Sequence, residues 1–134
     1  MISKSHRFVV DSWAWIEYLD GSEIGSQIKN YIEDEKNIIL TSSLTIAEVV
    51  SRFLRKRTNP HEAVAAISSL SRVLPADLKI AAFAGELHAE IRASIKDFGL
   101  ADSFILAAAK VEKAIILTGD PHFKGFPEAL VFRK

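Results

Sequence analysis

Four acidic residues are the part of this sequence whose types and positions could do chemistry. Asp11 stands at the carboxyl end of the first strand-like run, and Asp120 stands just past the carboxyl end of a later one. Glu48 lies one turn into a helical stretch, and Asp102 lies in the first turn of another. Sites in open α/β sheets form outside the carboxyl ends of the strands. These positions favour convergence of the four carboxylates on one site.

Such a cluster would favour cation binding. If all four acids converge, the pocket holds a formal charge of about minus four, and like charges at roughly 5 Å repel unless they take up protons or bind cations. Hard oxygen ligands, without histidine or cysteine, select Mg²⁺ or Mn²⁺ over zinc. A carboxylate-held Mg²⁺ gathers phosphate oxygens and water, which is the equipment for phosphodiester hydrolysis.

Each acid also has a purely structural interpretation. Asp11 could shape a strand-to-helix turn, and Asp120 is a good turn residue before a proline. Asp102 would complement the dipole of its helix. Glu48 could form a solvated pair with Arg52, four residues on. The functional interpretation therefore depends on the conjunction of the four.

The strands that must position these acids are short apolar runs. Phe8–Val10, Ile38–Leu40 and Ala114–Thr118 are the clearest, and Val73–Leu74 and Leu130–Phe132 are weaker candidates. None of the clear runs alternates with polar residues, which indicates strands covered on both faces, as in a parallel sheet.

Helical stretches separate the strands. We expect Ser12 and Ser22 to cap the first two helices, and Pro60 to stand in the first turn of the fourth. The expected helices are Trp13–Leu19, Glu23–Asp34, Leu44–Arg57, Pro60 to about Arg72, Asp77 to about Lys96, and Ala101–Lys113. Strands that alternate with helices predict an α/β domain with right-handed crossovers. The last helix is apolar nearly all round, so its one early carboxylate must face out at an end.

Composition narrows the class of protein. The chain has 134 residues, 49% apolar and 25% charged, which fits one globular domain over residues 1–134. Lysine plus arginine equals aspartate plus glutamate at 17 each, so any nucleic-acid role must come from a local site. The absence of cysteine excludes a disulfide framework, a zinc ribbon and a cysteine nucleophile. The four histidines show no metal-ligand spacing.

No apolar stretch approaches the roughly 20 residues that span a bilayer. The polar N-terminus does not resemble a signal peptide. We therefore expect no membrane partner and a cytoplasmic location.

Two further surfaces invite interpretation. Arg52, Arg55, Lys56 and Arg57 cluster at the end of the Glu48 helix. They could contact phosphates along an RNA strand, which would make binding salt-dependent, or could simply favour the helix dipole. The stretch Trp13–Leu19 is apolar nearly all round, which fits either burial under the next helix or a partner surface.

Other chemistries find less support. An aspartyl-phosphate hydrolase needs a second acid two residues after the first strand's aspartate, where this chain has Trp13. A phospho-accepting receiver domain needs an acidic pair at the first strand, which is missing here. A nucleotide-binding module needs a glycine-rich phosphate loop, and no such pattern occurs.

Four blocks in order carry a resemblance to a known family. They are Val-Val-Asp-Ser (9–12), Leu-Thr-Ile-Ala-Glu-Val (44–49), Leu-Ala-Asp-Ser-Phe-Ile-Leu-Ala-Ala-Ala (100–109) and Leu-Thr-Gly-Asp-Pro-His-Phe (117–123). Their succession resembles a PIN domain and, more narrowly, the VapC-type toxins of prokaryotic toxin–antitoxin pairs. The resemblance implies a three-layer domain with a central, mostly parallel five-stranded sheet flanked by helices. It also implies a Mg²⁺- or Mn²⁺-dependent endoribonuclease.

The resemblance also assigns residues. Asp11, Glu48, Asp102 and Asp120 fall on the family's acidic tetrad. Our hypothesis is that Asp11, Asp102 and Asp120 hold the metal directly or through water, while Glu48 ligates a second metal or orients the attacking water.

Three further positions are informative. Ser12 and Thr118 fall on hydroxyl positions beside the first and fourth acids, and the family arrangement puts their two strands side by side. Trp13 departs from the family, where a small residue is more usual.

The resemblance further implies a homodimer and a VapB-type antitoxin. A housekeeping RNA-processing nuclease, or a non-catalytic RNA- or protein-binding module of the same fold, are the alternatives.

Overall fold

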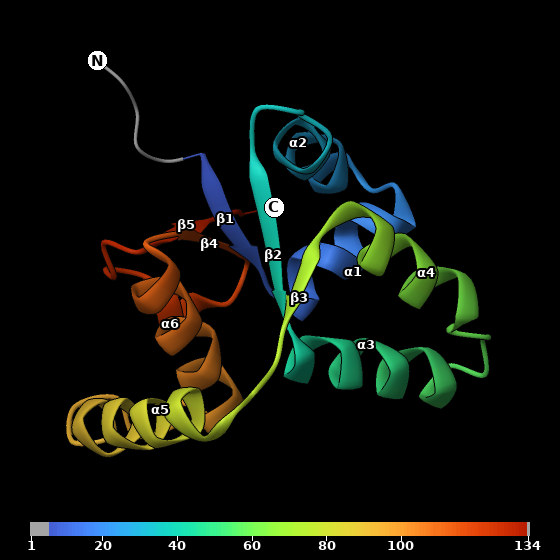
Figure 1. The fold of residues 1–134 in the computed structure, drawn as a ribbon. Coiled ribbons are helices and arrows are strands. Elements are labelled where there is room, and N and C mark those ends of the chain that lie inside the picture. The colour runs from blue at the N-terminus through green and yellow to red at the C-terminus, as the bar shows by residue number, and fades with distance from the viewer. Residues whose placement is uncertain (1–5, 134) are drawn as a thin grey trace.

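Five parallel strands form the central sheet of this protein (Figure 1). The computed structural model describes residues 6–133, and every pairing between neighbouring strands is parallel, in the order β3-β2-β1-β4-β5. The strands are β1 (Arg7–Val10), β2 (Ile38–Ser42), β3 (Arg72–Leu74), β4 (Ile115–Thr118) and β5 (Ala129–Val131). The predicted α/β class and five-stranded sheet are confirmed, and both weaker strand candidates are real edge strands.

Helices cover both faces of the sheet. One face carries α1 (Ser12–Asp20), α2 (Glu23–Ile32), α3 (Ser43–Arg55) and α4 (His61–Leu70), and the other carries α5 (Leu78–Ile91) and α6 (Leu100–Glu112). None of these helices, nor any other in the described chain, is long and apolar enough to cross a bilayer.

Successive residues of the central strands pack into two separate hydrophobic cores, one on each face of the sheet. Phe8 and Val10 of β1 belong to the core under α1–α4, whereas Val9 between them belongs to the core under α5 and α6. Neighbouring β4 does the same, with Leu117 on the first face and Ile116 on the second. Because successive strand side chains point to opposite faces, an uninterrupted apolar run is what a doubly covered strand requires. The pattern predicted from the sequence is confirmed.

The chain order places a switch point beside β1. From β1 the chain runs outward to β2 and β3, then returns to the other side of β1 with β4 and β5. The registers Val10↔Leu117 and Val9↔Ile116 put the carboxyl ends of β1 and β4 next to each other. Residues that follow these two strands therefore meet at one edge of the sheet, where α/β proteins build their sites.

Several helix ends differ from the prediction. Asp11, rather than Ser12, caps α1: its Oδ1 accepts a hydrogen bond from the Ala14 amide at 2.9 Å. Pro60 is the N-cap of α4 rather than a first-turn residue, and that helix stops at Leu70. The predicted end near Arg72 is wrong because that residue is paired with β2 as the start of β3.

Helix α5 is shorter than predicted, ending at Ile91 instead of near Lys96. The chain reverses there so that Phe98 can enter the second core, where it is fully buried and stacks on Phe126. Helix α3 likewise ends at Arg55, and Arg57 adopts a left-handed conformation just beyond it.

Candidate active site

Asp11 is held at the carboxyl end of β1 by contacts on both sides. Its backbone amide donates to Leu117 O of β4 at 3.2 Å, and its carboxylate caps α1 through the Ala14 amide. The Thr118 hydroxyl donates to the other carboxylate oxygen. Asp11 is almost completely buried, so this carboxylate is fixed in place.

Thr118 also holds the second strand-end acid. Its Oγ1 accepts a hydrogen bond from the Asp120 amide at 2.9 Å. Asp120 in turn caps a single 3₁₀ turn, η1 (Pro121–Phe123), by accepting from the His122 amide at 2.9 Å. One hydroxyl therefore ties Asp11 to Asp120, as their positions at adjacent strand ends suggested.

Asp102 reaches the same edge from the N-terminus of α6. It is the third residue of that helix, and its Oδ2 accepts a hydrogen bond from the Gly99 amide at 3.0 Å. The following residues Ile105 to Ala109 are buried. The expectation that this acid faces out at the helix end is confirmed.

Glu48 completes the group from α3. It receives a hydrogen bond from Ser12, the first residue of α1. No ion pair joins Glu48 to Arg52 among residues 6–133, so the structure does not form the solvated pair that was the structural alternative.

The four acids line one hollow of about 310 Å³. It opens between the ends of β1 and β4 and the helices α1, α3 and α6. Its lining is Asp11, Ser12, Trp13, Glu48, Ala101, Asp102, Ile105, Gly119, Asp120 and Pro121. The structure thus brings together all four predicted acids with Ser12. Thr118 is buried and does not line the hollow, but its hydroxyl contacts both Asp11 and Asp120.

Burial and mutual repulsion raise the pKa of three of these carboxyls. Burial raises the pKa of Asp11 to about 7, against the opposing hydrogen bonds from Thr118 and Ala14. Partial desolvation beside the hollow also raises the pKa values of Glu48, which is exposed overall, and of the half-buried Asp102, and the charge of Asp120 adds to both. Raised pKa values mean that the ionised forms of these carboxyls are disfavoured when no cation is bound. A divalent cation bound among them would stabilise the ionised forms.

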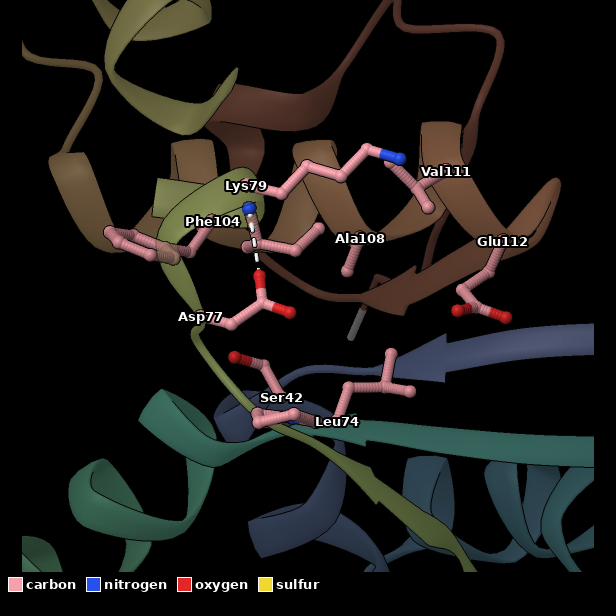
Figure 2. Close-up of a pocket in the computed structure, with 10 residues that line it drawn as sticks. Ser42, Leu74, Asp77, Lys79, Phe104, Ala108, Val111 and Glu112 are labelled. Atoms are coloured by element: carbon pink, nitrogen blue, oxygen red, sulfur yellow. Dashed lines mark hydrogen bonds between the residues drawn. The ribbon is translucent and has the colours of Figure 1, made fainter. Parts of the chain in front are cut away.

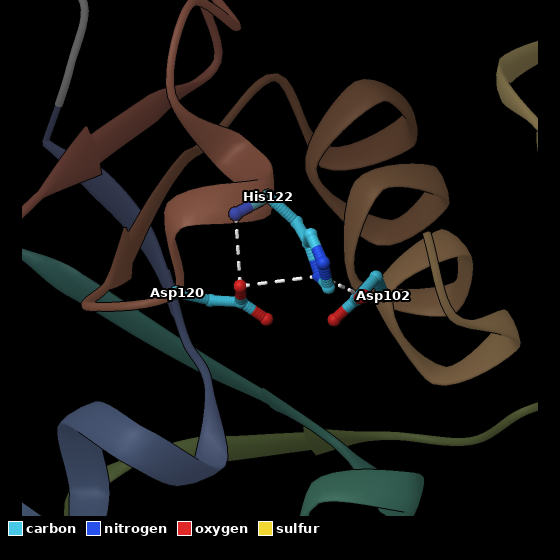
Figure 3. A group of neighbouring side chains, drawn as sticks. All are labelled: Asp102, Asp120 and His122. Atoms are coloured by element: carbon cyan, nitrogen blue, oxygen red, sulfur yellow. Dashed lines mark hydrogen bonds and ion pairs between the residues drawn. The ribbon is translucent and has the colours of Figure 1, made fainter. Parts of the chain in front are cut away.

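His122 is a neighbour of this cluster that the sequence interpretation missed (Figure 3). Its Nδ1 lies 3.4 Å from Asp102 Oδ2 and 3.3 Å from Asp120 Oδ1. Its Nε2 lies 3.1 Å from Asp97 Oδ2. The hydrogen bond with Asp97 is the main cause that raises the pKa of His122, and the three surrounding carboxylates add to it.

A metal ion could use this histidine as well as the acids. One ligand atom each from Asp102, Asp120 and His122 lie within 4.8 Å of one another. His122 is thus a possible ligand in addition to the acids that the sequence predicted. The available signal was local: His122 follows Asp120 by two residues, and the tight turn η1 folds it back onto the acids.

A second hollow of about 440 Å³ adjoins the acidic one. Ser12, Trp13 and Glu48 line both, and the second is completed by α3 residues that include Arg52 and Arg55. The two predicted substrate-binding residues Arg52 and Arg55 therefore line the hollow next to the acidic one, and Glu48 lines both hollows. Lys56 and Arg57 do not line it.

A third hollow, of about 150 Å³, lies elsewhere between α6 and the chain that leads from β3 into α5 (Figure 2). Its lining includes Leu74, Phe104 and Val111 but none of the four acids. Asp77 at its rim accepts a hydrogen bond from the Ile80 amide at 3.0 Å and so caps α5. That carboxylate has a structural role.

Comparison with known proteins agrees with this architecture. The PIN domain family model matches residues 8–129. The fold is similar to a toxin–antitoxin complex from Klebsiella pneumoniae, with 19% identity, a TM-score of 0.73, and coverage of 92% of this chain and 95% of that chain. No curated protein matches significantly.

Two further solved structures are similar. One is VapBC2 from Rickettsia felis bound to a DNA fragment from its promoter, with 17% identity, a TM-score of 0.74, and coverage of 94% of this chain and 97% of that one. The other is VapC20 from Mycobacterium tuberculosis, a toxin that cleaves the sarcin–ricin loop, with 18% identity, a TM-score of 0.65, and coverage of 94% and 89%. At these identities the likeness is one of fold.

Proposed function

Because the chain belongs to the PIN domain family, we propose that it is a metal-dependent endoribonuclease that hydrolyses RNA phosphodiester bonds through its four carboxylates. The observation that carries the proposal is the single hollow lined by Asp11, Glu48, Asp102 and Asp120, which come from four different parts of the chain. The pKa values of Asp11, Glu48 and Asp102 are raised there, chiefly by burial, and carboxyls perturbed in this way are typical of functional sites.

The donor set fits a divalent cation, Mg²⁺ or Mn²⁺. Asp11, Asp102 and Asp120 would hold it, with Glu48 at the rim, and hard carboxylate oxygens are what both ions prefer. When bound, such an ion neutralises a phosphate oxygen and lowers the pKa of water.

The chain's own groups have distinct tasks in this proposal. Thr118 donates to Asp11 and so keeps that carboxylate oriented and nearer its ionised form. Glu48, with a raised pKa and a hydrogen bond from Ser12, would accept a proton from the attacking water. Arg52 and Arg55 would hold the phosphates of the neighbouring RNA strand in the adjoining hollow.

We further propose that the nuclease is the toxin of a type II toxin–antitoxin pair. It would act in the cytoplasm as a homodimer that is held inactive by a VapB-type antitoxin. Support comes from the similar structures, which include a toxin–antitoxin complex and VapBC2. A neighbouring gene that encodes a short DNA-binding protein would favour this role, and its absence would favour a housekeeping RNA-processing nuclease.

The decisive experiment is cleavage of end-labelled RNAs with Mn²⁺, Mg²⁺ or EDTA. We expect cleavage by the wild-type protein with either metal, no cleavage in EDTA, and a loss of about 100-fold or more in Asp102→Asn, because removal of one charge-stabilising group commonly has that effect. Glu62 is an exposed acid on α4 that does not line the hollow, so Glu62→Gln is the matched control and should cleave normally.

The outcomes separate the alternatives. Cuts that persist in Asp102→Asn would indicate a contaminating nuclease and contradict the proposal. Binding of RNA and metal without any cleavage would favour the non-catalytic binding module.

A further inference from the structure

Trp13 occupies the boundary between the acidic hollow and the basic one. It lines both, together with Ser12 and Glu48, and its side chain is partly exposed. Trp13 packs partly against the core under α1–α4, and its neighbours along the chain have other roles: Asp11 belongs to the acidic cluster and Ala14 is fully buried.

Gly119 packs against one face of the Trp13 indole ring. A Cβ atom placed on Gly119 would lie 2.4, 2.4 and 2.5 Å from the ring atoms Cε2, Cζ2 and Cδ2 of Trp13. Three nearly equal distances to adjacent ring atoms mean that Gly119 lies over the face of the six-membered ring, not at its edge. The absence of a side chain at this position is what allows the ring to lie there.

A ring fixed in this way is suited to stacking. Contact on one face restricts the ring before a ligand arrives, so less entropy is lost on binding than for a freely rotating side chain. It also stands between a site for phosphate chemistry and the guanidinium groups of Arg52 and Arg55. Aromatic rings placed along a basic groove are how proteins hold the bases of single-stranded nucleic acids.

We propose that Trp13 is a nucleobase-stacking platform, which receives the base next to the phosphate that lies over the acidic hollow while Arg52 and Arg55 hold the adjoining backbone. This inference rests on the proposed function and deepens it, because it names unpaired RNA as the substrate class and a single residue as the contact for a base. A ring that stacks on any base face selects for single strands, since paired bases are not available to it.

The test uses the fact that the chain has only two tryptophans. Trp15 is fully buried and donates through Nε1 to Thr41, whereas Trp13 is partly exposed. Trp15→Phe therefore leaves Trp13 as the sole tryptophan, and Thr41 keeps its hydrogen bond with Ser71. Trp13→Phe leaves only the buried reporter and still offers an aromatic ring.

All binding measurements use the Asp102→Asn background with Mg²⁺, so that the RNA stays intact. A short single-stranded RNA should quench the fluorescence of the Trp15→Phe protein and leave that of the Trp13→Phe protein unchanged. Inorganic polyphosphate, which has charge but no bases, should quench neither. Trp13→Leu should weaken RNA binding by about 10- to 100-fold, while Trp13→Phe should remain within a few-fold of the parent.

Two results would overturn the platform. One is an unchanged RNA affinity in Trp13→Leu, with only its melting temperature lowered, which would make the ring a packing residue. The other is equal quenching of Trp13 by RNA and by polyphosphate. If Trp13→Leu does not fold, the quenching of the Trp15→Phe protein decides the question.

Failure of the proposed function gives a different pattern. A protein that shows base-dependent quenching but no metal-dependent cleavage retains the platform and loses the nuclease activity. A protein that cleaves RNA, but whose Trp13→Leu variant binds and cleaves as the parent does, retains the nuclease activity and loses the platform.

Discussion

At the scale of single residues, the site depends on side chains that serve the fold and the chemistry together. The carboxylate of Asp11 caps α1 and lines the acidic hollow, and the Thr118 hydroxyl joins it to the Asp120 amide. Because one oxygen of Asp11 is used for each contact, the group cannot rotate freely. These two contacts hold the carboxylate in one orientation, as a group that lines a proposed site requires.

Thr118→Val tests this arrangement at the level of one hydrogen bond. The Thr118 hydroxyl lowers the pKa of Asp11, so its loss should raise that pKa further and move the acidic limb of the pH–cleavage profile upward by roughly one pH unit. The direction follows because cleavage in the proposed mechanism requires ionised Asp11. The measurement is the cleavage rate against pH at one fixed, sub-saturating Mn²⁺ concentration, so that protons compete with the metal for Asp11.

Thr118→Ser keeps the hydroxyl and is the matched control. Its acidic limb should coincide with that of the wild type. A Thr118→Val profile that overlays the wild type, with only a lower plateau, would contradict the assignment of this hydrogen bond to the ionised state of Asp11.

At the scale of elements, the site is built where strand ends meet helix starts. The acids enter from the ends of β1 and β4, from the first turn of α6 and from α3, so each is attached to a rigid element. Helix α1 approaches the link between β4 and η1 closely where the Trp13 ring lies against Gly119. A side chain at Gly119 would therefore push these two elements apart.

Two glycine-to-alanine substitutions should have opposite effects on stability. Gly119→Ala should lower the free energy of unfolding by about 1–3 kcal/mol, because its Cβ would overlap the Trp13 ring at 2.4 Å. Gly85→Ala, in α5 with no heavy atom within 4 Å of the new Cβ, should raise it by up to about 1 kcal/mol. Urea unfolding in EDTA measures both.

The double variant adds a control for the cause. In a Trp13→Leu background, Gly119→Ala should destabilise less than it does alone, since the ring face is gone. An equal loss in both backgrounds would show that the strain lies elsewhere.

At the scale of the whole molecule, the positive and negative charges balance, but negative charge is concentrated at one place. The chain has no formal net charge, yet four carboxylates share one hollow. The balance leaves the rest of the surface without a strong bias toward polyanions, so RNA would have to be recognised at the site itself. The adjoining hollow with Arg52 and Arg55 is placed to supply that recognition.

The carboxyls of the acidic hollow also predict how the free energy of unfolding depends on pH when no metal is bound. Burial raises the pKa of Asp11 in the fold from 3.8 to about 7, and the pKa values of Glu48, Asp102 and His122 shift in the same direction. The stability that comes from protonated Asp11 is fully present below about pH 4 and is lost as the pH rises through about 7. In EDTA, the free energy of unfolding should therefore fall by about 2–3 kcal/mol between about pH 5 and pH 8.

Two comparisons check this linkage. Asp11→Asn should flatten the slope, because the amide does not titrate. Mg²⁺ or Mn²⁺ should stabilise the wild type more at pH 8 than at pH 5, since metal and protons compete for the same carboxylates. Stability that rises from pH 5 to pH 8 in EDTA would contradict the raised pKa values.

Local pattern was enough to predict the fold class and the positions of the acids. Apolar runs without alternation indicate doubly covered strands wherever they occur, and Asp11 and Asp120 follow two such runs directly. The strand at Phe8–Val10 and the helix that begins near Asp102 are where the sequence placed them. These features depend on residues within one or two turns of each other, so periodicity and end signals report them.

The remaining features depend on contacts between distant parts of the chain. Thr118 donates to Asp11 across 107 residues, Gly119 covers the ring of Trp13, and His122 reaches Asp102 only because η1 folds back. Whether Ser12 or Asp11 caps α1 likewise depends on how β1 enters the sheet. Local propensity carries no information about such approaches, because strand order and core packing decide which turn meets which helix. The acids were therefore visible in the sequence, whereas the histidine beside them and the aromatic ring at their border acquired their positions from tertiary packing alone.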